Sequence, residues 1–201
     1  MKRTADAEQD KAPPTKRIKP GTKSISKYYP LYLVFEFNKG HMEKIAIFPG
    51  SFDPFTIGHE SIVRRAIPMF DKIVIMIGYN SNKQSFFKLE KRLTWVRQVF
   101  ADEPKVEVMS HEGLTVDFCK KVGANYILRG LRTSADFEYE RAIAQVNKKM
   151  HPQIETVFLL TMPEHTPVNS TIVRDIILHG GDASMFLPKG LNMDEFTRED
   201  D

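Results

Sequence analysis

The stretch "KIAIFPGSFDPFTIGHESIV" (residues 44–63) decides the fold, because it combines a strand signal and a helix signal with a short turn between them. The apolar run at its start is typical of a buried strand, and Pro49 and Gly50 end that strand. His59 then falls in the first turn of the helix that follows. The start of a helix offers unpaired N–H groups and a partial positive charge, which favour a phosphate. The stretch therefore predicts an anion site between the first strand and the first helix.

Short apolar runs and helical spacing alternate from there to the end of the chain. Runs rich in Ile, Val, Phe or Leu predict fully buried strands at residues 44–48, 72–78, 105–109, 125–128 and 155–160. Apolar residues at helical spacing predict helix faces marked by Ile62, Val63, Ala66 and Ile67, by Leu89, Leu93, Val96 and Val99, by Val116, Phe118 and Cys119, by Phe137, Ala142, Ile143, Val146 and Met150, and by Ile172, Val173, Ile176 and Ile177. Glycines 180 and 181 predict a left-handed cap on the last helix. We therefore expect an α/β fold, a Rossmann-like doubly wound sheet of about five parallel strands with helices on both faces.

Ligands of such a sheet bind beyond the carboxyl ends of its strands, so the residues that follow each strand are the candidates for a site. Ser51 follows the first strand and Lys83 follows the second. The fourth is followed by "RGLR" (residues 129–132), where two guanidinium groups suit bidentate contact with phosphate oxygens. The fifth is followed by "PEHTPVNST" (residues 163–171), whose last three residues would cap a helix or hold another phosphate.

Each of these residues also has an ordinary structural explanation when it is taken singly. A histidine in a first helical turn is more often a capping or surface residue than a catalytic one, and a lone lysine in a polar loop is most often solvated. Neither GxxxxGK[ST] nor GxGxxG occurs in the chain, so a P-loop and a dinucleotide fingerprint are both excluded. Only the combination of these groups at one edge of the sheet points to a site.

Length and composition limit the class of protein. With 201 residues, 41% of them hydrophobic and 27% charged, the chain suits one globular domain of ordinary size. The single cysteine, Cys119, excludes an intramolecular disulfide and a CxxC motif, which favours a reducing, cytoplasmic setting. No apolar stretch approaches the roughly 18 to 20 residues that cross a bilayer, so we expect no membrane association.

The first 41 residues differ from the rest in charge and pattern. They hold nine Lys/Arg and four Asp/Glu, a net of +5, whereas residues 42–201 sum to −2. We expect this basic leader to be disordered and to be a tag or cloning extension, with a native start at Met42. An alternative is a two-part nuclear localisation signal, because Lys2-Arg3 precedes a second basic cluster at residues 16–19. Residues 42–201 are then expected to form a single folded domain.

"TIGH" (residues 56–59) after a strand resembles the TxGH motif of the nucleotidyltransferase superfamily. "PGSFDPFTIGH" together with "ILRGLRTSADFEYE" is similar to the phosphopantetheine adenylyltransferases in particular, and the resemblance runs from about Met42 to Leu187. It implies direct transfer of the adenylyl group of ATP to 4'-phosphopantetheine, which gives dephospho-coenzyme A and pyrophosphate in coenzyme A biosynthesis. Such a transfer needs alignment and charge neutralisation more than a protein nucleophile.

The resemblance also implies roles for single residues. His59 would be the catalytic residue, which hydrogen-bonds the α-phosphate and stabilises the transition state. The residues implied to bind phosphopantetheine are Ser51, Lys83, Thr115 and Arg129. The residues implied to bind ATP are Ser51, Phe52, His59, Gly130, Leu131, Arg132, Glu140, His165, Thr166, Pro167, Val168, Asn169, Ser170 and Thr171. Mg²⁺ would bridge the phosphates with few direct protein ligands.

The chain departs from the family pattern at two places. Ser51 stands where the family often has threonine, which keeps the hydroxyl group, and the segment 165–171 differs more, so its ATP contacts are less well defined. The resemblance further implies a homohexamer and feedback inhibition by coenzyme A.

Two other functions remain open at this point. The nearer one is another TxGH enzyme, such as a nicotinate-mononucleotide adenylyltransferase or a cytidylyltransferase, although "RGLRTSADFEYE" argues against it. The farther one is a non-enzymatic protein that binds nucleic acid through its basic leader. The negative net charge of residues 42–201 and the lack of a basic stripe with interleaved aromatic residues argue against nucleic acid as a partner.

Overall fold

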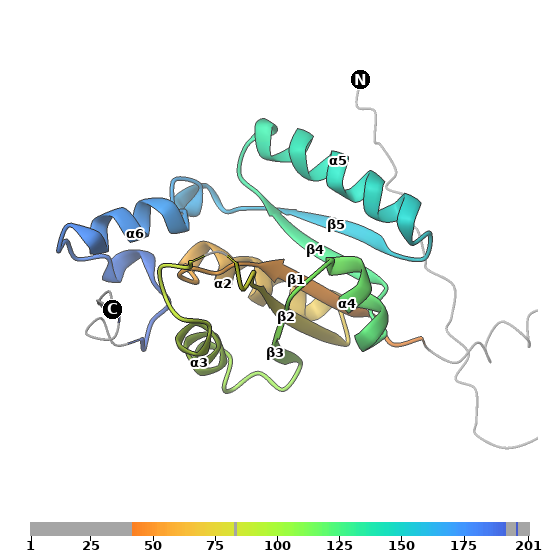
Figure 1. The fold of residues 1–201 in the computed structure, drawn as a ribbon, viewed down its shortest axis with the longest axis horizontal. Coiled ribbons are helices and arrows are strands. Elements are labelled where there is room, and N and C mark those ends of the chain that lie inside the picture. Colours follow the sequence, from red (N-terminus) through yellow and green to blue (C-terminus); the bar gives the residue numbers. More distant parts are fainter. Residues whose placement is uncertain (1–41, 83, 192–195, 197–201) are drawn as a thin grey trace, which may run out of the picture. The chain divides into compact units, whose positions relative to one another are not determined.

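Parallel strands in the order β3-β2-β1-β4-β5 form the sheet of the computed structural model, which describes residues 42–82, 84–191 and 196 (Figure 1). The strands are β1 (Ile45–Gly50), β2 (Lys72–Gly78), β3 (Val106–His111), β4 (Tyr126–Leu131) and β5 (Glu155–Leu160). All of them lie within three residues of the predicted bounds, and the parallel α/β fold is confirmed. The predictions for residues 1–41 lie outside the described residues.

Helices cover both faces of this sheet, as the sequence predicts. They are α2 (Ile57–Ala66), α3 (Leu89–Val99), α4 (Thr115–Val122), α5 (Ser134–Met150) and α6 (Ser170–Leu178), with short 3₁₀ turns η2 (Ile67–Met69), η3 (Pro163–His165) and η4 (Ser184–Phe186). On one face, Val63 of α2 and Val96 of α3 pack with Ile75 of β2. On the other, Phe118 of α4 packs with Ile47 of β1. Figure 1 shows α5 along β4 and β5.

The prediction that all the strands are fully buried is wrong for the two edge strands. β1 and β2 are buried along almost their whole length, but β3 and β5 are largely half-buried, and Leu160 at the end of β5 is 71% exposed. The apolar face predicted for α5 is also partly open to solvent, with Val146 57% exposed. An edge strand has a neighbour on one side only, and the sequence does not tell an edge strand from a central one when both are rich in Val, Ile and Leu.

The strand order reverses between β1 and β4, and there the sheet opens. β1 pairs with β2 over six residues but with β4 only through Ala46 and Ile47. Beyond that point Pro49 has no N–H to offer, and its carbonyl oxygen accepts a hydrogen bond from the Arg129 side chain at 2.6 Å. The two strands therefore separate at their carboxyl ends, at the kind of switch point where ligands bind in open α/β sheets.

The end of the described chain packs beside the carboxyl edge of the sheet. Val173 of α6 joins Phe87, Trp95 and Phe196 in a separate apolar cluster, in which the rings of Trp95 and Phe196 stack at 4.0 Å. Gly180 follows α6 with a φ of 71°, so the predicted left-handed cap is confirmed.

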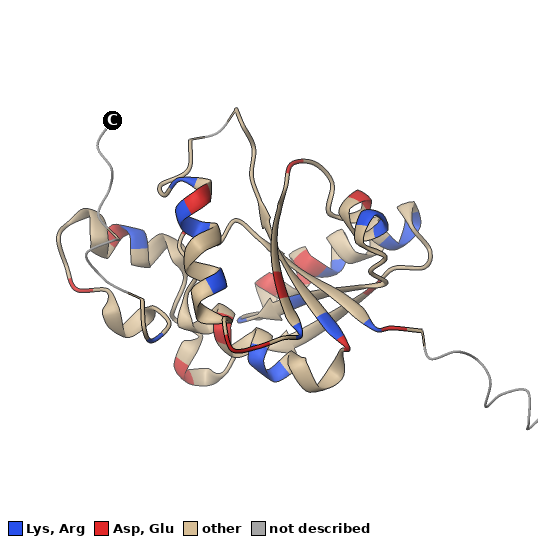
Figure 2. Cartoon of the chain, turned by 90° about the horizontal axis from the view of Figure 1, so that it is seen from below, with Lys and Arg blue, Asp and Glu red and all other residues tan. Residues whose placement is uncertain are grey.

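No helix in the described part of the chain has the length and apolar content to span a membrane. Figure 2 shows Lys/Arg and Asp/Glu distributed over the same helices.

Candidate active site

The turn between β1 and α2 is held in a tight shape by its own aromatic residues. Phe52 has a φ of 47° and is 3% exposed. A Cβ on Gly50 would lie 2.6 Å from the Phe52 ring, so only glycine fits at that position. The carboxylate of Asp53 is buried and accepts hydrogen bonds from the N–H groups of Phe86 and Phe87 at 2.8 and 2.9 Å. These contacts fix the backbone that leads to the first helix.

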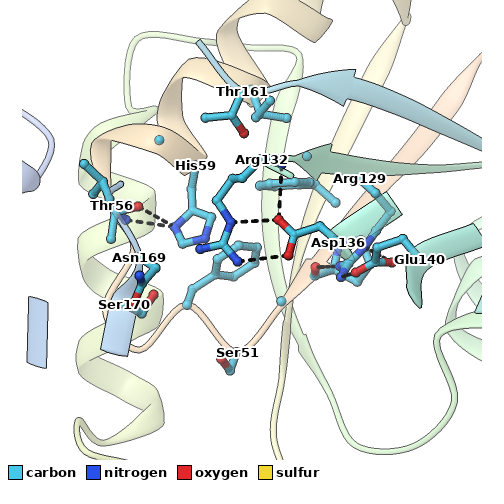
Figure 3. A pocket seen from close by; sticks show the side chains of 18 of the residues that line it. Ser51, Thr56, His59, Arg129, Arg132, Asp136, Glu140, Thr161, Asn169 and Ser170 are labelled. Carbon is cyan, nitrogen blue, oxygen red and sulfur yellow. Dashed lines mark hydrogen bonds and ion pairs between the residues drawn. The ribbon is translucent and has the colours of Figure 1, made fainter. Parts of the chain in front are cut away.

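His59 lies in the first turn of α2, as predicted, and its ring is packed against this aromatic turn. The centroids of the Phe52 and Phe55 rings lie 5.2 and 5.3 Å from that of His59. The backbone N–H of Thr56 donates to Nδ1 of His59 at 3.0 Å (Figure 3). Because Nδ1 accepts this hydrogen bond, the proton of the neutral imidazole is on Nε2, which is then a hydrogen-bond donor.

The electrostatic surroundings of His59 favour this neutral form. Burial and, to a smaller extent, the nearby positive charges of Arg132 and Arg129 together lower the pKa of His59 to about 4. At neutral pH the side chain is therefore an uncharged donor, and the positive charge near it comes from the arginines.

Both arginines of the "RGLR" segment are paired with acidic residues of α5. Arg129 donates from Nε to Glu140 at 2.8 Å and from Nη2 to the other carboxylate oxygen of Glu140. Arg132 donates from Nε and Nη2 to the two carboxylate oxygens of Asp136, at 3.0 and 3.4 Å. Burial raises the pKa of Asp136, but the hydrogen bonds and charge of Arg132 outweigh this effect, so the pKa lies below its usual range. The predicted phosphate-binding guanidinium groups thus already have one carboxylate each.

These groups line a cavity of about 340 Å³ at the opening between β1 and β4 (Figure 3). His59, Arg129, Arg132 and Glu140 contribute to its walls, and Asn169 closes the side formed by the start of α6. The starts of α2 and α6 both contribute residues to this cavity. Their unpaired N–H groups and dipoles add to the positive field of the arginines.

A second cavity, of about 280 Å³, adjoins the first. The two cavities share Pro49, Gly50, Arg129 and Glu140. The walls of the second are more apolar, and its lining includes Met76, Thr115, Ile127, Ile143 and Asn147. The arrangement offers a charged chamber and an apolar chamber that meet at Arg129.

The structure brings most of the predicted site residues to these cavities. The first is lined by Ser51, Phe52, His59, Arg129, Gly130, Arg132, Glu140, Val168, Asn169 and Ser170, and the second by Thr115. Others lie elsewhere: Leu131 is 6% exposed, Thr171 accepts a hydrogen bond from Arg174, and His165, Thr166 and Pro167 lie in or next to η3, outside the lining of either cavity in the described part of the chain. Lys83 lies outside the described residues.

Two of the predicted contacts of segment 165–171 are used within the protein. The Asn169 side chain caps α6 by accepting a hydrogen bond from the N–H of Ile172 at 3.0 Å. The Ser170 hydroxyl donates to the carbonyl oxygen of Pro54 at 2.9 Å. This segment therefore ties the start of α6 to the β1–α2 turn. The sequence pattern allows either capping or phosphate binding for residues 169–171, and in the structure Asn169 is a cap.

Sequence reasoning missed several residues that line the cavities, among them Tyr139 and Thr161 in the first and Asn147 in the second. Two more are Thr56, the partner of His59, and Asp136, the partner of Arg132. Both belong to an N-cap pattern that is typical of helix starts. In this pattern a threonine stands three residues before a polar partner, as Thr133 stands before Asp136. That pattern could have marked both residues as ordered and polar, although not as lining a cavity.

A magnesium ion is compatible with this cavity only if the substrates supply most of its ligands. In the described part of the chain no group of three or more His, Cys, Asp or Glu side chains could hold a metal. The two acidic residues of the cavity, Asp136 and Glu140, are both engaged by arginines. This donor set suits Mg²⁺ bound by phosphate oxygens and water, a common arrangement for this ion.

Comparison with known proteins finds similarity to one family model and to relatives that share one activity in their names. Residues 47–176 match the model of the family described as cytidylyltransferase-like. The chain is 53% identical to the phosphopantetheine adenylyltransferase of Flavobacterium psychrophilum over 74% of this chain and 97% of that protein. It is 51% identical to the phosphopantetheine adenylyltransferase of Bacteroides fragilis, over 74% of this chain and 98% of that protein.

Solved structures with the same fold are more distant in sequence. One is a putative nicotinate-nucleotide adenylyltransferase from Vibrio parahaemolyticus, with a TM-score of 0.53 and 19% identity over 73% of this chain and 94% of that one. Another is a bifunctional NMN adenylyltransferase/ADP-ribose pyrophosphatase from Francisella tularensis, with a TM-score of 0.59 and 17% identity over 75% of this chain and 46% of that one. At these identities the likeness concerns the fold alone.

Proposed function

Since the chain belongs to the cytidylyltransferase-like family and, within it, to the phosphopantetheine adenylyltransferases, we propose that it transfers the adenylyl group of ATP to 4'-phosphopantetheine. The products are dephospho-coenzyme A and pyrophosphate, and the reaction belongs to coenzyme A biosynthesis. Residues 42–201 form the nucleotidyltransferase domain. The observation that carries this proposal, beside the family, is the pair of cavities that meet at Arg129.

The two cavities suit the two substrates in different ways. The charged one, with His59 and Arg132, takes the triphosphate of ATP, because guanidinium groups and helix starts favour phosphate oxygens. The apolar one takes the pantetheine arm, whose methyl and methylene groups pack on Met76 and Ile143 while Thr115 and Asn147 are available to its amides. The phosphate of phosphopantetheine then lies at the junction, within reach of Arg129.

In the reaction, an oxygen of the phosphopantetheine phosphate forms a bond to the α-phosphorus of ATP, and the bond from that phosphorus to the bridging oxygen breaks. Pyrophosphate leaves, and no bond to the protein forms. The Nε2–H of His59 donates to an α-phosphate oxygen as negative charge builds there in the transition state. Arg132 balances the charge of the leaving pyrophosphate, and Arg129 holds the attacking phosphate in line.

Mg²⁺ supplies further charge neutralisation at the phosphates when it is bound. The Ser51 hydroxyl and the N–H groups at the start of α2 and α6 are further donors available to the phosphates, and Lys83 is proposed to contact the phosphopantetheine phosphate. Glu140 holds Arg129 at the junction of the two cavities and is proposed to contact the ribose or adenine of ATP.

The test is an activity assay with purified protein, ATP and Mg²⁺, in which pyrophosphate release is followed and the nucleotide product is identified. Dephospho-coenzyme A should form with phosphopantetheine, and no product should form with nicotinate mononucleotide or with CTP in place of ATP. Adenylylation of nicotinate mononucleotide in place of phosphopantetheine would show that the chain is a different TxGH enzyme.

A homohexamer, feedback inhibition by coenzyme A and a cytoplasmic location are further parts of this proposal. The exposed apolar side chains of α5 and of the end of β5, among them Val146, Met150 and Leu160, support assembly into an oligomer. Light scattering on a size-exclusion column tests the assembly, and a monomer at micromolar concentration would contradict it. Coenzyme A should lower the rate in the same assay.

A further inference from the structure

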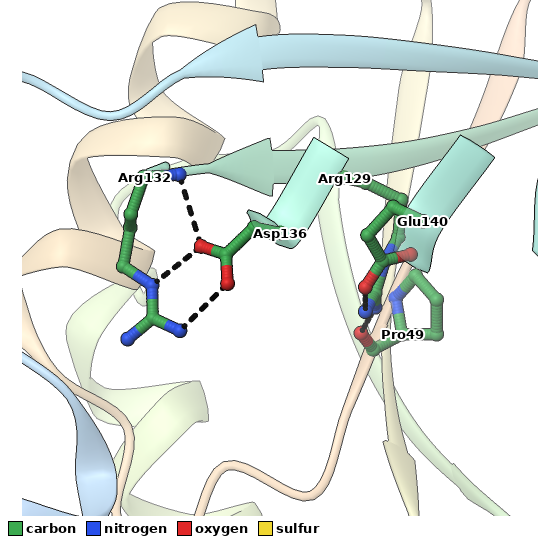
Figure 4. Close-up of polar contacts among 5 residues, drawn as sticks. All are labelled: Pro49, Arg129, Arg132, Asp136 and Glu140. Carbon is green, nitrogen blue, oxygen red and sulfur yellow. Dashed lines mark hydrogen bonds and ion pairs between the residues drawn. The ribbon is translucent and has the colours of Figure 1, made fainter. Parts of the chain in front are cut away.

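Arg129 of β4 and Arg132, the first residue after this strand, are held by the same side of their guanidinium groups. In each, Nε and Nη2 face a carboxylate, that of Glu140 for Arg129 and that of Asp136 for Arg132 (Figure 4). The two acids are four residues apart on α5, so they lie on one face of that helix, one turn apart. The first two turns of α5 thus hold both of these arginines.

This arrangement decides which N–H groups remain for a ligand. A guanidinium has five N–H bonds in a planar fork, and a carboxylate on the Nε and Nη2 side uses two of them. In Arg132, the hydrogen bonds within the described part of the chain leave both N–H bonds of Nη1 and the second one of Nη2. In Arg129, one Nη1–H is also taken, by the carbonyl oxygen of Pro49. Arg132 therefore keeps its Nη1–Nη2 edge for a bidentate contact, whereas Arg129 keeps one N–H of Nη1 and one of Nη2.

We propose that Asp136 is a positioning residue of the reaction, which holds Arg132 so that its Nη1–Nη2 edge meets the phosphates of ATP. This inference rests on the function proposed above. Asp136 and Arg132 line the same cavity as His59, and Figure 3 shows the Arg132 guanidinium between His59 and the Asp136 carboxylate. Asp136 does not touch the reacting atoms and acts through Arg132.

The physical reason for such a residue is that an arginine side chain is long and flexible. Both partners are partly exposed, with 38% of the Arg132 side chain and 28% of the Asp136 side chain accessible. Without a partner, the guanidinium would sample several rotamers and would lose that freedom when ATP binds. The carboxylate removes this cost in advance, and its negative charge also keeps phosphate oxygens away from the Nε side.

A structural role at the start of α5 is the competing explanation. Asp136 is the third residue of this helix, its carboxylate accepts a hydrogen bond from the backbone N–H of Arg132 at 3.2 Å, and its own N–H donates to the Thr133 hydroxyl at 3.2 Å. An acid in a first turn stabilises a helix through the dipole. A structural role predicts lower stability alone, whereas a positioning role predicts a specific kinetic change that depends on Arg132.

The experiment compares Asp136→Asn with the matched variant Glu138→Gln in the proposed assay. Glu138 pairs with Arg141 on the same helix, but both side chains are exposed. We expect Asp136→Asn to lower kcat/KM for ATP about tenfold, mostly through kcat, with the KM for phosphopantetheine unchanged within twofold. Glu138→Gln should stay within twofold of the unsubstituted protein in kcat, in kcat/KM for ATP and in the KM for phosphopantetheine. Equal behaviour of the two variants would overturn the inference.

A double-mutant cycle with Arg132→Ala shows whether Asp136 acts through Arg132. The effect of Asp136→Asn should shrink to less than twofold once Arg132 is absent, because there is no guanidinium left to position. An undiminished effect in the Arg132→Ala background would overturn the inference in favour of a direct or structural role. If Asp136→Asn does not fold, Asp136→Glu replaces it. This variant keeps the charge at the helix start but moves the carboxylate by one methylene, so a severalfold loss supports the inference and full activity contradicts it.

This design separates the inference from the proposed function. An unsubstituted protein that makes no dephospho-coenzyme A refutes the function. An active protein in which Asp136→Asn matches the control refutes the positioning role alone.

Discussion

The β1–α2 turn and the start of α5 meet at the same cavity, but they hold their functional groups by opposite means. The turn surrounds His59 with aromatic rings and leaves it uncharged. The start of α5 is charged and partly exposed, and each arginine is held there by a carboxylate. A neutral donor can be fixed by packing because its burial costs much less than that of a charge, whereas a cation in a half-buried site needs a counter-charge. The two regions should therefore respond differently to substitution.

The largest effect is expected in the packed region, from His59→Ala. Loss of the Nε2–H donor should raise the barrier by about 3 kcal/mol, which lowers kcat by about two orders of magnitude with a much smaller change in KM. His59→Gln should retain more activity than His59→Ala, because the amide nitrogen of glutamine reaches the position of Nε2. Steady-state kinetics measures both effects.

His179→Ala is the control for this substitution, because His179 lies at the exposed end of α6. It should behave like the unsubstituted protein. A His59→Ala variant with near-normal turnover would remove His59 from the mechanism and leave the arginines as the main source of transition-state stabilisation.

The next largest effect is expected in the charged region, from Arg129→Ala. This change should raise the KM for phosphopantetheine about 10- to 100-fold, the range expected for lost hydrogen bonds to a charged group. It also leaves the carboxylate of Glu140, which is 9% exposed, without its partner. Arg129→Ala combined with Glu140→Gln removes that unpaired charge, so the double variant should be more stable than the single one while its KM stays high.

Arg141→Ala is the matched control. Arg141 lies on α5, the helix that carries Glu140, but its ion pair with Glu138 is exposed on the surface. It should leave the KM for phosphopantetheine unchanged. An unchanged KM in Arg129→Ala would break the assignment of this residue to the second substrate.

The packed region is also the one that the sequence predicts best. The apolar strand, the Pro49-Gly50 stop and the position of His59 in the first turn of α2 all follow from local patterns, and the structure has each of them. The reason is that these features depend on residues close together in the chain. The exact strand bounds differ by a few residues because the parallel ladder continues past the apolar run, as at Gly50 and Leu131.

The charged region is predicted less completely. The sequence places Arg129 and Arg132 at a strand end, but their carboxylate partners depend on how α5 lies against β4. Burial is missed for a similar reason, since the exposure of β5 and of α5 depends on which strand lies at the edge. Local patterns thus identify the groups of the site, and tertiary packing decides which side of each group remains open.

The smallest expected effect is on stability, and it distinguishes the packed region once more. The pKa of His59 is about 4 in the folded protein, whereas an unperturbed histidine of the unfolded chain titrates near 6.5. Between these values the unfolded chain binds more protons than the folded one, so the free energy of unfolding falls as the pH falls from about 6.5 towards 4. His59 as a residue is only half-buried, so solvent screening reduces the effect, and we expect about 1 kcal/mol of this loss between pH 7 and pH 5.

Urea unfolding of the unsubstituted protein and of His59→Gln at pH 7 and pH 5 measures this contribution. Glutamine does not titrate, so the variant should lose about 1 kcal/mol less between the two pH values. The paired carboxylate of Asp136 titrates below this range, because its pKa is lowered, and it is common to both proteins. Parallel losses in the two proteins would mean that His59 is protonated as readily in the folded chain as in the unfolded one. The aromatic turn would then not be the cause of its neutral state, and the contrast between the two regions would fail.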